Sequence, residues 1–180
     1  LPVTKTHPID AIKYAAHVGL TSVGENRVQE VKTKKPLHKG NCRWELIGHL
    51  QSNKVNEAVF LFDRIQSVDS LKLIQKLNSA CEVSGKFLPI FLQCNAGKDP
   101  NKYGFSEESI SEALEMVLGS AFLKCEGLMT IAVSLGEQGM VMTTTDVYTR
   151  MKLGTTLTNN NVSRFYDFST KTLYSKAFGF

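Results

Sequence analysis

The sequence is poor in cysteine and contains no pair of cysteines at metal-binding spacing. Its four cysteines, Cys42, Cys81, Cys94 and Cys125, include no Cys-x-x-Cys pair, which excludes zinc-ribbon and thioredoxin-like sites. Cys81 and Cys94 stand among apolar residues, so we expect them to be reduced, buried thiols of a cytosolic protein.

Long hydrophobic runs and a strong excess of charge are also missing. No apolar run approaches the roughly 18 residues that a membrane span requires, which excludes an integral membrane protein. The chain starts at Leu1 with no basic-then-apolar signal segment, and we expect its first element to be cut into. The net charge is only +4.

One basic cluster deserves a separate interpretation, because basic patches can bind nucleic acid. Its members are Lys32, Lys34, Lys35, Lys39 and Arg43. No aromatic residues alternate with them and the overall charge is mild, so a solvated helix end and loop is the better account. We therefore expect neither a nucleic-acid nor a membrane partner.

The composition present is that of one ordinary globular domain covering residues 1–180. Of its residues, 42% are hydrophobic and 21% are charged, enough to bury a core and too apolar for a disordered chain. Short apolar runs at residues 3–5, 21–23, 44–48, 65–68, 87–94 and 123–130 alternate with segments of helical periodicity. Asp69 and Ser106 are expected helix N-caps.

Six such alternations predict an α/β protein with parallel strands. A (β/α)₈ barrel of the TIM type is favoured over an open doubly wound sheet, because no Gly-x-Gly-x-x-Gly loop follows the first strand. After Ile131 the rhythm breaks, and polar tracts such as residues 143–145 and 159–161 indicate loops. The barrel is thus expected to be incomplete or divergent in its last third.

Working residues of parallel α/β folds lie at the carboxyl ends of the strands. Lys5 closes the first strand, where a desolvated amine could attack a carbonyl carbon to form a Schiff base. A lysine that simply extends to solvent explains the same position. His49 could hold a ligand or be a plain loop histidine. Glu25 and Asp69 lie on different strands and form no evident acid/base pair.

The strand ends, taken in order, resemble one known family. Residues 3–8 read V-T-K-T-H-P, residues 24–30 read G-E-N-R-V-Q-E, and residues 44–54 read W-E-L-I-G-H-L-Q-S-N-K. These segments are similar to V-S-K-T-x-P, G-E-N-x-V-Q-E and W-H-x-I-G-x-L-Q-x-N-K of the pyridoxal phosphate homeostasis proteins. Further matches at residues 67–70, 102–105 and 127–131 follow in the same order, so the resemblance covers residues 1–131.

The resemblance implies a (β/α)₈ barrel related to the N-terminal domain of alanine racemase. It also implies that Lys5 holds pyridoxal 5′-phosphate (PLP) as a Schiff base, with Asn26 lining the cofactor pocket. Proteins of this family are thought to buffer the cofactor in the cytoplasm and deliver it to PLP-dependent apo-enzymes, without robust catalysis of their own.

The phosphate end of the expected site departs from the family pattern. Residues 151–157, M-K-L-G-T-T-L, resemble a family segment that has arginine where this chain has Lys152. By resemblance, Ser134, Gly154 and Thr155 would take the phosphate. About a helix and a strand are missing between Ile131 and Ser134, so residues 132–180 diverge from the family.

Two further functions remain open at this point. A true enzyme could use Lys5 and the bound cofactor on amino acids, as a racemase does. Alternatively, the altered last third could have abolished cofactor binding and left an inactive barrel.

Overall fold

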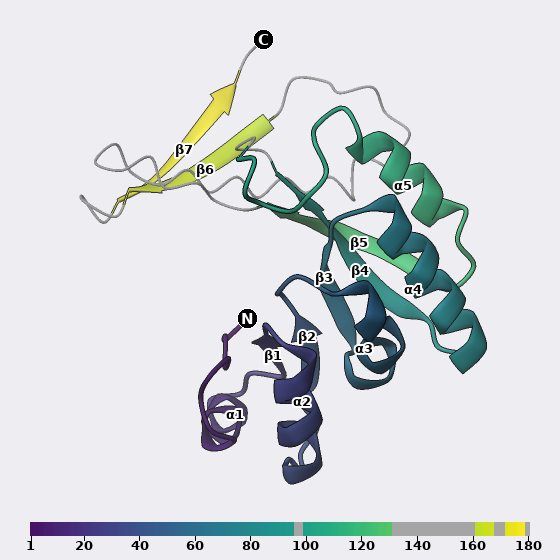
Figure 1. Ribbon diagram of the computed structural model, residues 1–180. Helices are drawn as coiled ribbons and strands as arrows, with labels where there is room; N and C mark the ends of the chain where they lie inside the picture. Colours follow the sequence, from purple (N-terminus) through teal and green to yellow (C-terminus); the bar gives the residue numbers. More distant parts are fainter. Residues whose placement is uncertain (96–98, 131–160, 168–171, 179–180) are drawn as a thin grey trace.

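Five parallel strands, joined by helices, form the main sheet of the computed structural model (Figure 1). The structure describes residues 1–95, 99–130, 161–167 and 172–178. The elements are α1 (Asp10–His17), β1 (Ser22–Glu25), α2 (Val28–Lys34), η1 (Lys35–Leu37), β2 (Arg43–Leu46), η2 (Ser52–Lys54), α3 (Val55–Leu61), β3 (Arg64–Val68), α4 (Leu71–Ser84), β4 (Leu88–Cys94), α5 (Ile110–Leu118), β5 (Leu123–Thr130), β6 (Asn161–Asp167) and β7 (Thr172–Phe178).

The strand order β1-β2-β3-β4-β5 follows the sequence, so the sheet is wound in one direction. Val3 adds an isolated parallel bridge to Gly24, which places the N-terminal segment beside β1. Helix α2 contacts α3, α3 contacts α4 and α4 contacts α5, and Figure 1 shows them along one side of the sheet. An order without reversal and a single helix layer are typical of a barrel wall rather than a doubly wound sheet.

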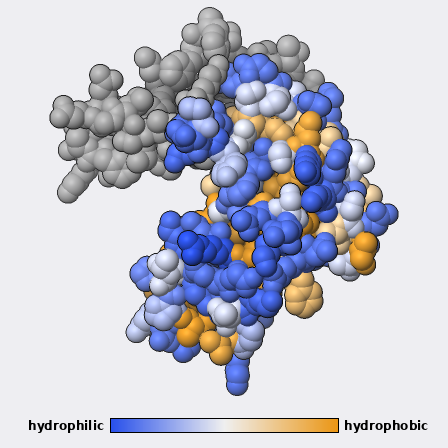
Figure 2. Space-filling model, viewed as in Figure 1, coloured by the Kyte–Doolittle hydropathy of each residue, from blue (hydrophilic) through white to orange (hydrophobic). Residues whose placement is uncertain are grey.

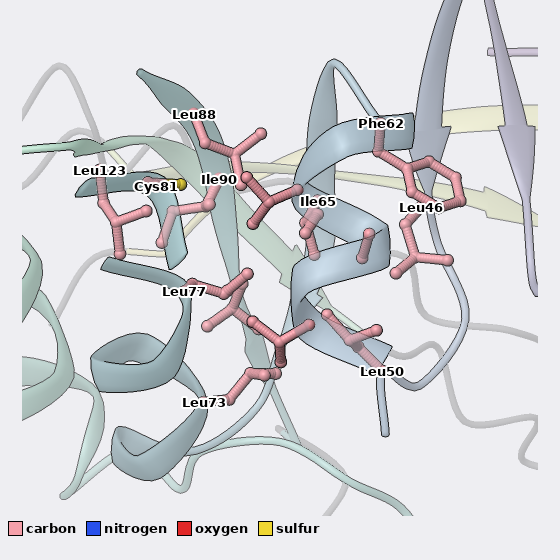
Figure 3. Close-up of a cluster of buried hydrophobic side chains, with 14 of the residues drawn as sticks. Leu46, Leu50, Phe62, Ile65, Leu73, Leu77, Cys81, Leu88, Ile90 and Leu123 are labelled. Atoms are coloured by element: carbon pink, nitrogen blue, oxygen red, sulfur yellow. The ribbon is translucent and has the colours of Figure 1, made fainter. Parts of the chain in front are cut away.

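The main core lies between the sheet and this helix layer. Figure 3 shows Leu73, Leu77 and Cys81 of α4 facing Ile65 and Ile90 of the strands. All five are at most 2% exposed. Their spacing in α4 follows the helical period that the sequence predicted, and fully buried strands are expected where helices cover a parallel sheet.

The other face of the sheet carries a polar network instead of aliphatic side chains. Arg64 donates from Nη1 to Glu45 Oε2 at 3.2 Å and from Nη2 to Glu126 Oε2 at 2.7 Å. Gln66 Nε2 also donates to Glu45, at 2.6 Å, and the Arg64 guanidinium lies 5.0 Å from the centroid of the Phe91 ring. Because strand side chains alternate between faces, these residues mark the face turned away from the hydrophobic core.

Two capping predictions were wrong in detail. Ser70, not Asp69, is the N-cap of α4, and its side chain accepts a hydrogen bond from the Leu73 amide. Asp69 is engaged elsewhere, with His49. Helix α5 begins only after Ser109, because Ser106 opens a separate turn in which its Oγ accepts from the Ser109 amide.

The polar last third contains regular structure in its described portions. Strands β6 and β7 pair antiparallel in register from Asn161 opposite Phe178 to Asp167 opposite Thr172. The sequence assigned no elements to this segment. The single-domain assignment over residues 1–180 stays a prediction.

The face shown in Figure 2 is mostly hydrophilic, with apolar side chains in separate patches. The exposed side chains of Phe60 and Val83 help to line a groove of about 740 Å³ between helices α3 and α4. In the described segments, no helix combines the length and the apolarity needed to cross a bilayer.

Candidate site at the carboxyl ends of the strands

Lys5 lies in a turn at the end of the N-terminal segment. Val3 is bridged to Gly24 in parallel, and the Thr4 amide donates to the Gly24 carbonyl at 3.0 Å, so the turn with Lys5 follows directly on a segment that pairs with the end of β1. Its side chain is exposed, and within the described part of the chain no hydrogen bond or ion pair engages it. The structure therefore brings the predicted Schiff-base lysine and the predicted pocket residue to one edge of the sheet.

The residue before Lys5 is fixed by a buried ion pair. The Thr4 hydroxyl donates to Glu25 Oε1 at 2.7 Å, and Glu25 is fully buried at the end of β1. Lys34, from α2, donates to the same Glu25 oxygen at 2.8 Å and to the Thr4 carbonyl at 2.9 Å. One ammonium group thus ties the first segment, β1 and α2 together.

The residue after Lys5 is held from the same helix. Thr6 has φ of 62°, a left-handed conformation that is unfavourable for a β-branched residue. Its amide donates to Glu30 Oε2 at 2.8 Å, and Lys34 Nζ lies 3.1 Å from the same oxygen. The backbone on both sides of Lys5 is consequently fixed while its amine stays available.

The contact with the Thr6 amide also lowers the pKa of Glu30. The hydrogen bond from the Thr6 amide holds the pKa of Glu30 below its ordinary value of 4.5, burial opposes the shift, and Lys34 adds to it. A carboxylate that accepts a backbone N–H is stabilised in its charged form.

Sequence reasoning missed the part played by Lys34. It had placed this residue in a solvated basic helix end, yet the Lys34 side chain is only 12% exposed. Spacing gave one signal, because Glu30 and Lys34 are four residues apart on a helix, but the partner Glu25 comes from the sheet.

The ends of β1 and β2 approach each other closely beside Asn26. A Cβ atom on Gly48 would lie 2.3 Å from the Asn26 carbonyl oxygen, so only glycine allows the two backbones to meet. Asn26 itself is half-buried. This contact explains why a glycine follows β2 in the I-G-H-L segment.

His49, Asp69 and Tyr103 converge from three different strand ends. His49 Nδ1 lies 2.7 Å from Asp69 Oδ2, and its ring stacks on Tyr103 with centroids 3.7 Å apart. Gln93, at the end of β4, donates to the Tyr103 carbonyl at 2.7 Å. His49 is therefore an oriented imidazole, which favours the ligand-holding interpretation over that of a plain loop histidine.

Four of the predicted site residues cannot be compared with the structure. Ser134, Lys152, Gly154 and Thr155 all lie outside the described residues. Their assignment to the phosphate stays a prediction. Among the described side chains, no group of three or more His, Cys, Asp or Glu residues could hold a metal ion.

The sequence matches a known protein family over most of its length. A family described as alanine racemase, N-terminal domain, matches residues 1–164. The chain belongs to this family. The barrel-type fold predicted from the alternation of strands and helices and from the motifs is thereby confirmed.

Curated relatives named pyridoxal phosphate homeostasis protein confirm the resemblance in the motifs. The Synechocystis protein is 37% identical over 131 residues, covering 72% of this chain and 60% of the relative. The Corynebacterium glutamicum protein is 32% identical over 138 residues, covering 73% and 62%. The chain thus spans about three-fifths of the length of these relatives.

Solved structures of similar fold include one protein of the same kind and one alanine racemase. PipY of Synechococcus elongatus with PLP bound is 34% identical, with a TM-score of 0.67 over 76% of this chain and 63% of PipY. Alanine racemase of Clostridium difficile, at 16% identity and a TM-score of 0.58, covers 72% of this chain and 34% of that one. It shows the shared fold only.

Proposed function

We propose that this chain binds PLP through a Schiff base on Lys5 and takes part in intracellular PLP homeostasis. The observation that carries the proposal is an available amine in the turn after the Val3–Gly24 bridge, where the two residues flanking the lysine are held by Glu25, Glu30 and Lys34. The PLP-bound structure of PipY and the names of the curated relatives support it. The free thiols suit the reducing cytoplasm.

The residues present fit such a cofactor. PLP, when bound, supplies an aldehyde for the lysine and an electron-withdrawing ring. Lys5 would bind the aldehyde carbon, and Asn26 would line the pocket from the end of β1. Ser134, Gly154 and Thr155, with Lys152, would receive the phosphate and ring. The Glu30–Lys34–Glu25 contacts would orient the lysine without touching the cofactor.

The direct test is to add PLP to the purified chain and reduce the mixture with borohydride. We expect a yellow protein and a fixed adduct that peptide mass spectrometry assigns to Lys5. Lys5→Ala should lose both signals, while Lys39→Ala, which removes another exposed lysine, should keep them. A chain that stays colourless would refute the proposal and favour an inactive barrel.

The positioning role of Lys34 predicts an effect on stability as well as on binding. Lys34→Met leaves Glu25 buried without its cation, which should cost about 3 kcal/mol. Lys34→Met/Glu25→Gln should recover much of this loss, because no isolated charge remains. Urea denaturation of the single and double variants measures the coupling, and a slower PLP reaction of the folded double variant would show the positioning effect.

Delivery to PLP-dependent apo-enzymes is the homeostatic step we propose. The loaded chain should restore activity to an apo-enzyme faster than it releases free PLP to a trapping reagent. Equal rates would mean simple release rather than delivery.

A racemase-like enzyme is the second candidate, favoured by the oriented His49 at the same edge of the sheet. His49 could move a proton with Asp69 fixing its ring. Racemisation of alanine or serine that disappears in both Lys5→Ala and His49→Gln would establish it. No turnover by the PLP-loaded chain would leave the carrier function.

A further inference from the structure

A second cavity lies at the carboxyl ends of β1 and β2, separate from the turn that carries Lys5. It has a volume of about 470 Å³. Its lining residues are Asn26, Arg27, Val28, Gln29, Gly48, His49, Gln51 and Lys54. All of them belong to the two segments 24–30 and 44–54; the proposed cofactor site uses only Asn26, and the second candidate function uses His49.

The residues that form the walls of this cavity are held in place by contacts with the rest of the structure. Val28 and Leu50, at 8% and 2% exposure, anchor the two segments in the core. Gly48 allows the strand ends to touch, because a side chain there would collide with the Asn26 carbonyl. The His49 ring is fixed by Asp69 and Tyr103.

The lining is cationic and rich in amide donors. It contains the guanidinium of Arg27 and the ammonium of Lys54, and no carboxylate is among the lining residues. Lys54 is 3.4 Å from Glu57, which lies closer, at 2.6 Å, to Lys32. Arg27 has no ion-pair partner among the residues described.

The geometry points to a binding site for an anionic group, a phosphate or a carboxylate of a small molecule, in this cavity. Arg27, which has no ion-pair partner in the described part of the chain, and Lys54, which shares Glu57 with Lys32, lie next to the side-chain amides of Gln29 and Gln51 and match the charge and the acceptor oxygens of such a group. The volume accommodates a small molecule. Lys5 is not among the lining residues, so the anion site can exist whether or not PLP binds to Lys5.

The test is a titration of the ¹⁵N-labelled chain followed by amide NMR. Inorganic phosphate and acetate are added in separate series at low, constant ionic strength. We expect saturable shifts of the amides of residues 27–29 and 49–54. Arg27→Gln/Lys54→Gln should weaken binding at least about ten-fold, while Arg43→Gln, an exposed arginine at the opposite end of β2, should bind as the parent does.

The two series separate the sources of the anion. A response to phosphate alone identifies a phosphate site, and a response to acetate identifies a carboxylate site. The inference is overturned if neither anion shifts these amides, or if the double variant, with an otherwise unchanged spectrum, responds equally. Single variants at Arg27 and Lys54 provide the same comparison should the double variant not fold.

Discussion

At the scale of single residues, the backbone around Lys5 is held by contacts of the residues on either side of it. Thr6 is held in a left-handed conformation by its hydrogen bond to Glu30, and Thr4 is held by Glu25 and Lys34. Strained residues persist where surrounding contacts over-determine them, and such positions often border functional groups. The exposed lysine is thus carried on a backbone with little freedom.

Glu30 predicts a pH dependence of stability. Its pKa is lowered in the folded chain by the Thr6 amide and by Lys34, so folding favours the ionised form. The stability this adds is complete above the ordinary value of 4.5 and is lost as pH falls through the lower folded value. Urea denaturation at several pH values below 4.5 should show less acid sensitivity in Glu30→Gln than in the parent.

The control for this experiment is Glu115→Gln, which changes an exposed carboxylate on α5. It should keep the acid sensitivity of the parent. Equal profiles for the parent and Glu30→Gln would contradict the role given to Glu30.

Gly48 predicts a steric cost. Alanine there places a methyl group 2.3 Å from the Asn26 carbonyl, so the backbone must move, at a cost of about 1–3 kcal/mol. Gly119→Ala meets nothing nearer than 3.6 Å at the end of α5 and should change stability by less than about 0.5 kcal/mol. Chemical denaturation compares the two, and similar values would rule out the close contact.

At the scale of elements, the segment after each strand places a different side chain at the carboxyl edge of the sheet. The N-terminal segment brings Lys5, β1 brings Asn26, and β2 brings His49, while the loop after β4 brings Tyr103 to the imidazole. Helix α2 faces this edge with Glu30 and Lys34. Parallel strands make this possible, because their carboxyl ends all meet at one edge.

The start of α4 offers a test of one element. Ser70 accepts the Leu73 amide, so Ser70→Ala should destabilise the chain by about 1 kcal/mol. Ser79→Ala, at an exposed position inside the same helix, should be neutral or slightly stabilising, because alanine is the better helix former. The thermal midpoint should therefore fall in Ser70→Ala and stay unchanged or rise slightly in Ser79→Ala; a loss in Ser79→Ala matching that in Ser70→Ala would contradict the capping role.

At the scale of the whole molecule, one sheet–helix core supports the site. Cys81, Cys94 and Cys125 are buried, as the sequence predicted for the first two, and all four cysteines are free thiols. Burial raises the pKa of the Cys81 thiol to about 11. Buried thiols of high pKa react only when the structure opens.

Thiol labelling should therefore follow global unfolding. Under native conditions we expect the half-buried Cys42 to react first and the other three to react at the rate of unfolding. Cys42→Ser should remove the early phase of labelling by a coloured disulfide reagent. Rapid reaction of all four thiols would mean that the core opens far more readily than its burial indicates.

The sequence by itself determined the fold class and the family. Alternating apolar runs and helical stripes specify parallel strands with covering helices, since burial of apolar side chains depends on periodicity. The ordered motifs, from residues 3–8 to 127–131, identified the family, whereas the roles that they imply for Lys5 and Asn26 stay predictions. Periodicity and motifs involve residues that are close together in the sequence, so they can be recognised without the structure.

Only the tertiary structure decided what surrounds the lysine. Lys34 looked like part of a solvated basic cluster and Asp69 like a helix cap, and the motif of residues 44–54 gave no reason for a glycine at Gly48. Each acquires its role from a partner about twenty residues away or on another element: Glu25 in the sheet, His49 on the neighbouring strand end, and the Asn26 carbonyl. Such contacts depend on the register and packing of strands against helices, which the spacing of residues along one element does not contain.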